Sequence, residues 1–181
     1  MKRRAVFIDR DGVINRTVVR KGKPYPPANL SEVEILPGVL DALTKLHDAG
    51  FMLIVVTNQP DVARGITPRA VVEEINAHLA ECLPIDEFRT CYHDNGDGCD
   101  CRKPLPGALM AAARQHGIDL VNSYMIGDRW RDTEAGRHAG CKTVFIDYDY
   151  DEQKTAMVDY RVTSLFEAAQ IILKGEPNEN N

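Results

Sequence analysis

The sequence lacks the features that mark membrane, secreted and nucleic-acid-binding proteins. Its 181 residues contain no apolar run near the roughly 20 residues that a transmembrane helix needs. Residues 1–5 are basic, but the apolar stretch after them is short and ends in acids, unlike a signal peptide. The formal net charge is −5, without the basic excess typical of nucleic-acid binding. We therefore expect a cytoplasmic protein that acts on neither a membrane nor a nucleic acid.

Cysteine is scarce and unevenly placed. The count is five, an odd number, and three of the five lie between positions 91 and 101. An odd count and a cluster favour a metal site in a reducing compartment over a disulfide framework. Cys82 and Cys141 lie outside the cluster, and we interpret them as packing residues.

Repeats, linkers and low-complexity stretches are absent as well. We therefore expect residues 1–174 to form a single domain and the polar residues 175–181 to be a frayed tail. The gaps between the expected elements leave little room for a large cap domain. No apolar stripe indicates a dimer interface, so a monomer is expected.

Apolar segments of strand length alternate with segments of helical periodicity. This alternation predicts a three-layer, Rossmann-like α/β fold, in which helices cover both faces of a parallel sheet. The expected strands are Ala5–Asp9, Met52–Thr57, Phe88–Tyr92, Tyr124–Ile126 and Thr143–Ile146, with a short edge strand near Tyr160–Val162. The expected helices lie within Gly38–Gly50, Pro68–Leu83, Pro106–His116, Asp132–Ala139 and Ser164–Leu173. The polar segment Val18–Ser31 contains three prolines and is expected to be a loop over the mouth of a site.

Two acids follow the first expected strand directly. Residues 6–15 read VFIDRDGVIN, so that Asp9 and Asp11 come at the carboxyl end of an apolar run. That edge of a parallel sheet is where ligands bind, and residues two apart on an extended segment point the same way. Two carboxylates held together repel unless they share a proton or a cation, and their oxygens suit Mg²⁺. Taken alone, the motif is also consistent with a turn that carries solvated acids.

Two further polar motifs are expected near the same edge. Thr57 and Asn58 end the second strand, although such a pair is also typical of a helix cap or turn. Arg102 and Lys103 precede a proline and so lie in a loop before a helix. Basic pairs on loops are often simply solvated. A lysine near two aspartates, however, can neutralise a phosphoryl group during its transfer.

The fourth motif is an acid after the fourth strand. Asp128 ends the run YMIGD, and Asp132 follows where the next helix starts. Asp128 is well placed to bind a metal, and Asp132 is either a helix cap or part of the site. In chain order the four motifs read D-x-D, T-N, K-P and G-D-x-x-x-D. This combination resembles the haloacid dehalogenase (HAD) superfamily of phosphotransferases over nearly the whole chain.

The resemblance implies a haloacid dehalogenase-like fold and a role for each motif. Asp9 is then the nucleophile that forms an aspartyl-phosphate, and Asp11 is the general acid and later the general base. Thr57 and Lys103 hold the phosphoryl group, while Asp9, the backbone carbonyl of Asp11 and Asp128 bind Mg²⁺. The chemistry is consistent, because metal and lysine neutralise the phosphoryl group that a carboxylate attacks. We also expect crowding of the acids to raise the pKa of Asp11, as protonation of a leaving group requires.

Residues 91–101, CYHDNGDGCDC, hold a second set of ligands. Cys91, His93, Cys99 and Cys101 make up the Cys₃His set of a closed, structural zinc site. A chance grouping of reduced thiols and one histidine is the alternative. The basic pair at 102 and 103 directly follows the last ligand, so zinc would fix its position.

Within the superfamily, the D-R-D-G motif, the zinc loop and G-D-R resemble two related groups. These are the D-glycero-D-manno-heptose 1,7-bisphosphate 7-phosphatases and the histidinol-phosphate phosphatases. Residues 62–65, VARG, resemble the heptose group, whereas the five-residue gap between His93 and Cys99 resembles the histidinol group. Residues 60–61 depart from the heptose pattern, and residues 16–31 match neither group.

The heptose group implies an enzyme that removes the 7-phosphate of a small sugar bisphosphate. Asn58, Arg102 and Arg64 are then the candidates for binding the substrate. Histidinol phosphate is the alternative substrate. A non-enzymatic alternative is a catalytically silent relative that binds a phosphometabolite or a partner protein.

Overall fold

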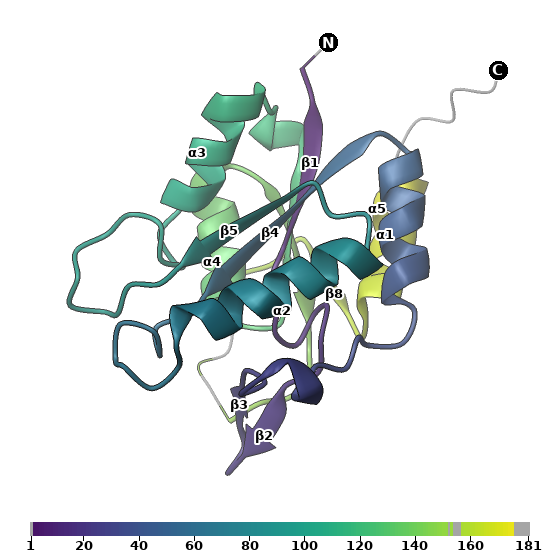
Figure 1. The fold of residues 1–181 in the computed structure, drawn as a ribbon. Coiled ribbons are helices and arrows are strands. Elements are labelled where there is room, and N and C mark those ends of the chain that lie inside the picture. The colour runs from purple at the N-terminus through teal and green to yellow at the C-terminus, as the bar shows by residue number, and fades with distance from the viewer. Residues whose placement is uncertain (1, 152, 154–156, 176–181) are drawn as a thin grey trace, which may run out of the picture.

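The computed structural model describes residues 2–151, 153 and 157–175, and these form three layers (Figure 1). Six strands form one parallel sheet in the order β5-β4-β1-β6-β7-β8. Their bounds are β1 Arg4–Ile8, β4 Phe51–Asn58, β5 Glu87–Cys91, β6 Tyr124–Gly127, β7 Lys142–Ile146 and β8 Tyr160–Val162. The helices are α1 Val39–Asp48, α2 Arg69–Cys82, α3 Gly107–His116, α4 Trp130–Ala139 and α5 Leu165–Lys174, with short 3₁₀ turns at Leu30–Glu32 and Leu120–Asn122. The α/β fold expected from the sequence is therefore confirmed.

Both faces of the sheet carry an apolar core, because side chains alternate along each strand. On β1, Val6 and Ile8 belong to the cluster that packs against α1, α2 and α5. Ala5 and Phe7 belong to the opposite cluster, which packs against α3 and α4. Since both faces are buried, the central strands read as continuous apolar runs. None of the described helices is long and apolar enough to cross a membrane.

The strand order indicates which edge of the sheet binds ligands. From β1 the chain adds β4 and β5 on one side, and it then returns to add β6, β7 and β8 on the other side. Ligands bind at such a reversal of strand order, beyond the carboxyl ends of the strands. Asp9 follows β1 and Asp128 follows β6, and these two strands are direct neighbours. The topology thus brings together two acids that lie more than a hundred residues apart.

The expectation of a loop at Val18–Ser31 is wrong in part. This segment contains an antiparallel hairpin, β2 Val18–Arg20 and β3 Lys23–Tyr25, followed by the 3₁₀ turn. Lys21 and Gly22 both have positive φ, 51° and 73°, as a two-residue type I′ hairpin turn requires. The hairpin does border the site, as expected. Of the polar tail at 175–181, only Gly175 falls within the described residues.

Candidate active site

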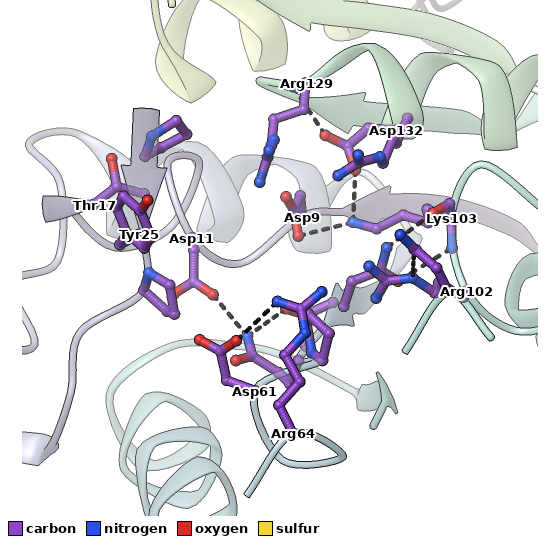
Figure 2. Close-up of a pocket in the computed structure, with 18 residues that line it drawn as sticks. Asp9, Asp11, Thr17, Tyr25, Asp61, Arg64, Arg102, Lys103, Arg129 and Asp132 are labelled. Atoms are coloured by element: carbon purple, nitrogen blue, oxygen red, sulfur yellow. Dashed lines mark hydrogen bonds and ion pairs between the residues drawn. The ribbon is translucent and has the colours of Figure 1, made fainter. Parts of the chain in front are cut away.

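A cavity of about 240 Å³ opens at the carboxyl edge of the sheet (Figure 2). Thr17, Pro24, Tyr25 and Pro26, from the hairpin and the residues directly before and after it, line one side. The sequence-predicted residues that line the cavity are Asp9, Asp11, Thr57, Asn58, Arg64, Arg102 and Lys103. Only the zinc ligands and Asp128, among the predicted residues, lie outside its lining. Arg129, Arg131 and Asp132 also line the cavity, so its lining comes from five separate parts of the chain.

A buried group of acids forms the floor of this site. Asp9, Asp128 and Asp132 each offer a carboxylate oxygen, and these oxygens lie within 4.8 Å of one another. Burial and the charge of Asp132 raise the pKa of Asp9 to about 6, although Lys103 opposes this. Burial and the charge of Asp9 raise the pKa of Asp128 well above its usual value. Mutual repulsion at low dielectric therefore favours uptake of a proton or a cation.

Asp128 is the acid whose surroundings most clearly fit a cation. Both of its carboxylate oxygens are buried without a hydrogen-bond partner among the described residues. The hydroxyl of Tyr150 comes near but instead pairs with Thr17, at 3.3 Å. Gly12, with φ of +93°, permits the close approach, since a Cβ there would lie 2.0 Å from Asp128 Oδ2. A hard divalent ion such as Mg²⁺ fits these unpaired oxygens.

Lys103 neutralises the other two acids. It is 2% exposed, and its Nζ lies 2.8 Å from Asp9 Oδ1 and 2.6 Å from Asp132 Oδ1. Nζ also donates to the Val56 carbonyl at 2.6 Å. Burial lowers the pKa of Lys103, but the charges of Asp132 and Asp9 outweigh it, so the pKa is raised. The lysine is therefore a fixed cation beside the expected nucleophile.

Asn58 and Asp132 act on this lysine. The Asn58 amide donates to the Lys103 carbonyl at 2.9 Å and accepts from the Lys103 N–H at 3.1 Å. Its polar atoms are thus engaged with the main chain of Lys103 rather than directed to a ligand. Asp132 accepts from the Arg129 N–H at 3.0 Å, so it caps α4 with one oxygen and pairs with Lys103 with the other. The N-cap of α4 is Arg129 and Asp132 is the third residue of the helix, so the expected N-cap position is wrong, although Asp132 does stabilise the start of the helix and contacts the expected site lysine.

Asp11 lies in a network of donors that sequence reasoning missed. Arg10 donates twice to its carboxylate, Asn15 Nδ2 donates at 2.9 Å and Gln59 Nε2 donates at 2.7 Å. Gln59 also donates to Thr57 Oγ1 at 2.9 Å and so links two predicted site residues. Burial alone would raise the pKa of Asp11, but Arg10 and these hydrogen bonds lower it. The expected upward shift of the Asp11 pKa is therefore wrong for the free site.

The four predicted zinc ligands come together beside the cavity. Their ligand atoms all lie within 4.8 Å of one another. Cys91 Sγ lies 3.6 Å from His93 Nδ1 and 3.8 Å from Cys99 Sγ, and Cys101 Sγ lies 3.4 Å from His93 Nδ1. A tetrahedral zinc with bonds of about 2.0–2.3 Å separates its ligands by about 3.3–3.8 Å. The donor set and its spacing therefore fit a zinc ion.

The two predicted arginines differ in how their charges are used. Arg64 pairs with Asp94 at 2.6 Å and with Asp61 at 3.1 Å, and so joins the loop after β4 to the zinc loop. Arg102 donates to Asn95 Oδ1 at 3.0 Å and to the His93 carbonyl at 3.2 Å, both neutral acceptors. Both arginines line the cavity. The charge of Arg102 is the more available to an anion.

Comparisons with known proteins identify relatives of this chain. Residues 100–167 match the model of a family described as HAD-hydrolase-like. A D-glycero-β-D-manno-heptose-1,7-bisphosphate 7-phosphatase of Pseudomonas aeruginosa is 36% identical over 81% of this chain and 82% of its own length. An enzyme of the same name from Escherichia coli is also 36% identical, over 77% of this chain and 76% of its own length.

Solved structures show the same relationship. The D,D-heptose 1,7-bisphosphate phosphatase of Bordetella bronchiseptica, solved with magnesium and phosphate, superposes with a TM-score of 0.80 at 27% identity, over 96% of this chain and 99% of that chain. A HAD-like phosphatase of Mesorhizobium loti gives 0.78 at 28% identity, over 99% and 90% of the two chains. The chain therefore belongs to the haloacid dehalogenase-like phosphatase family that includes these heptose-bisphosphate enzymes.

Proposed function

We propose that this phosphatase removes the 7-phosphate of D-glycero-β-D-manno-heptose 1,7-bisphosphate through an aspartyl-phosphate intermediate. The observation that carries the chemistry is the contact of Asp9 with Lys103, beside the unpaired Asp128. The names of the relatives at 36% identity support the substrate and its β anomer. In the cell, we expect a single-domain monomer acting on a soluble sugar phosphate in the cytoplasm.

The residues divide the reaction into two transfers. An Asp9 oxygen attacks phosphorus while Asp11 gives its proton to the leaving sugar oxygen, so the P–O bond breaks as the aspartyl-phosphate forms. Asp11 then takes a proton from water, whose oxygen attacks phosphorus and releases phosphate and Asp9. Thr57 and Lys103 hold the phosphoryl oxygens. The dianionic phosphate next to Asp11 raises the pKa of that acid again, because like charges disfavour its ionised form.

Two metals complete the proposal. Asp9, Asp128 and the backbone carbonyl of Asp11 would hold Mg²⁺, which supplies charge neutralisation of the phosphoryl group and keeps Asp9 ionised. Cys91, His93, Cys99 and Cys101 would hold a structural zinc. Arg102 is available to bind the substrate's oxygens, and Arg64 supports the loop that carries it.

Initial rates of phosphate release with Mg²⁺ test the proposal. The panel holds both anomers of the heptose 1,7-bisphosphate, histidinol phosphate and fructose 1,6-bisphosphate, with Asp9→Asn as the blank. A preference of about a hundredfold for the β-heptose, about 2.7 kcal/mol in transition-state binding, supports the proposed substrate. Preference for histidinol phosphate would replace the substrate and leave the mechanism standing. Equal rates for wild type and Asp9→Asn would contradict the mechanism itself.

A further inference from the structure

Arg10 is an arginine inside the protein, next to the cavity but not part of its lining. Its exposed fraction is 0%, and it lies between Asp9 and Asp11 in the chain. Its guanidinium grips Asp11 with two donors, Nε to Oδ1 at 3.2 Å and Nη2 to Oδ2 at 3.0 Å. A planar fork that engages both carboxylate oxygens fixes the plane of the carboxylate as well as its position.

Asn76 holds the other side of this arginine. It lies within α2 and is 8% exposed, and its Oδ1 accepts from Arg10 Nη1 at 2.9 Å. Its Nδ2 donates to Thr90 Oγ1 at 3.1 Å, on the strand that carries the zinc ligand Cys91. Asparagine is a mediocre residue inside a helix, where its side chain competes with the backbone for hydrogen bonds. Here both of its polar groups have side-chain partners. Asn76 therefore connects Arg10 to Thr90 of β5 instead of competing for the backbone hydrogen bonds of α2.

We propose that Asn76 is a positioning residue for proton transfer and acts on Asp11 through Arg10. Thr90, Asn76, Arg10 and Asp11 form a continuous hydrogen-bonded relay from β5 to the cavity. The inference rests on the proposed function, because it assumes that Asp11 exchanges protons with the substrate and with water.

Removing the Asn76 amide breaks the relay at the hydrogen bond from Arg10 Nη1. In Asn76→Ala, Arg10 Nη1 loses its acceptor inside the protein, where an unpaired charged donor is unfavourable. The guanidinium then turns towards another acceptor, and its fork no longer matches the plane of the Asp11 carboxylate. Proton transfer depends on that geometry, whereas substrate binding by Lys103 and Arg102 does not.

Two substrates separate proton transfer from the rest of the reaction. An alkyl phosphate needs its leaving oxygen protonated, but p-nitrophenyl phosphate releases a weakly basic phenolate and gains little from the acid. The alkyl substrate is the phosphate of the four-compound panel that wild type hydrolyses fastest, so the test does not depend on the heptose. The ratio kcat/KM reports the steps up to formation of the aspartyl-phosphate, so it excludes the second transfer, which both substrates share. We expect Asn76→Ala to lower kcat/KM on the alkyl substrate by about tenfold or more, and on the aryl substrate by less than about threefold.

Two variants control for damage to the helix. Leu79→Ala removes buried packing from the same helix but none of the hydrogen bonds of Arg10, and it is expected to lower stability but leave the alkyl-to-aryl ratio of kcat/KM unchanged. Asn76→Asp keeps an acceptor for Arg10 and is expected to restore most of the ratio. If Asn76→Ala leaves the ratio at the wild-type value, or if Leu79→Ala changes it equally, the positioning role is wrong.

Asp11→Asn distinguishes this failure from failure of the proposed function. It is expected to lower kcat/KM on the alkyl substrate far more than on the aryl substrate. If Asp11→Asn does so and Asn76→Ala does not, the relay is refuted while the mechanism stands. If Asp11→Asn leaves the ratio unchanged, the acid role of Asp11 is wrong and the relay has no purpose in catalysis.

Discussion

Replacing Lys103 with methionine tests whether one buried cation balances the acids of the site. The lysine is 2% exposed and contacts Asp9 at 2.8 Å and Asp132 at 2.6 Å. Methionine keeps most of its volume but leaves three buried carboxylates within 4.8 Å of one another without their lysine. Removing one partner of a buried ion pair costs about 3–5 kcal/mol, so we expect the free energy of unfolding to fall by about that amount.

The assay is urea denaturation followed by circular dichroism, with EDTA present, and the free energy comes from linear extrapolation. Lys45→Met is the matched control, because Lys45 is exposed and pairs with Asp41 at 2.8 Å on the surface of α1. An exposed pair of this kind contributes about 1 kcal/mol or less. Mg²⁺ is expected to return part of the stability lost in Lys103→Met, since it binds the folded carboxylates and not the unfolded chain.

The effect also has a definite pH dependence. Without the lysine, which opposes the rise, the pKa of Asp9 is raised further, so the folded state binds more protons than the unfolded state and gains stability as the pH falls. The loss of unfolding free energy in Lys103→Met should therefore shrink in acid and be largest at neutral and higher pH. A loss of unfolding free energy no larger than that of Lys45→Met, or one that is the same at every pH, would refute the reasoning.

Three further predictions concern the metals and the arginines. Asp128→Asn should abolish Mg²⁺-dependent activity yet stabilise the protein in EDTA by about 1–3 kcal/mol, because it removes an unpaired buried acid. Since the pKa of Asp128 is raised on folding, this gain should grow as the pH rises from about 4, and a gain that shrinks would contradict the assignment. Elemental analysis should find about one zinc per chain, and its removal by a chelator should lower kcat/KM; full activity without zinc would contradict the role of the loop. Arg102→Ala should raise KM by about tenfold, and Arg64→Ala, whose charge is already paired, by less than about threefold; the reverse order in steady-state kinetics would exchange their roles.

The sequence predicts the sheet and its reactive edge because both depend on local patterns. Apolar runs that end in polar residues mark β1, β4 and β6, and the parallel topology then brings their ends together. The spacing of the zinc ligands is equally local. Strand and helix bounds differ from the expected ones by one or two residues, as at α4, which begins at Trp130 rather than Asp132.

The features that the sequence did not reveal depend on contacts between distant residues. Strands of three residues are too short for a period of two to appear, and only Lys21-Gly22 gave a signal for the hairpin between them. Nothing near Arg10 in the chain indicates that a helix more than sixty residues later supplies its acceptor. The charge of Arg10 and the hydrogen bonds from Arg10, Asn15 and Gln59 explain why the pKa of Asp11 is lowered, whereas counting acids alone predicts that it is raised.

The position of Lys103 connects the zinc loop to the chemistry. A lysine side chain loses about 2 kcal/mol of rotamer entropy when it is fixed, so a site that depends on one must hold its backbone firmly. Here the main chain is held on both sides: Cys101, a predicted zinc ligand, lies two residues earlier, and Asn58 binds both the N–H and the carbonyl of Lys103. Charge placed in advance lowers a transition state without reorganisation during the reaction. Zinc binding should therefore affect catalysis through the location of one ammonium group, even though the predicted zinc ligands lie outside the lining of the cavity.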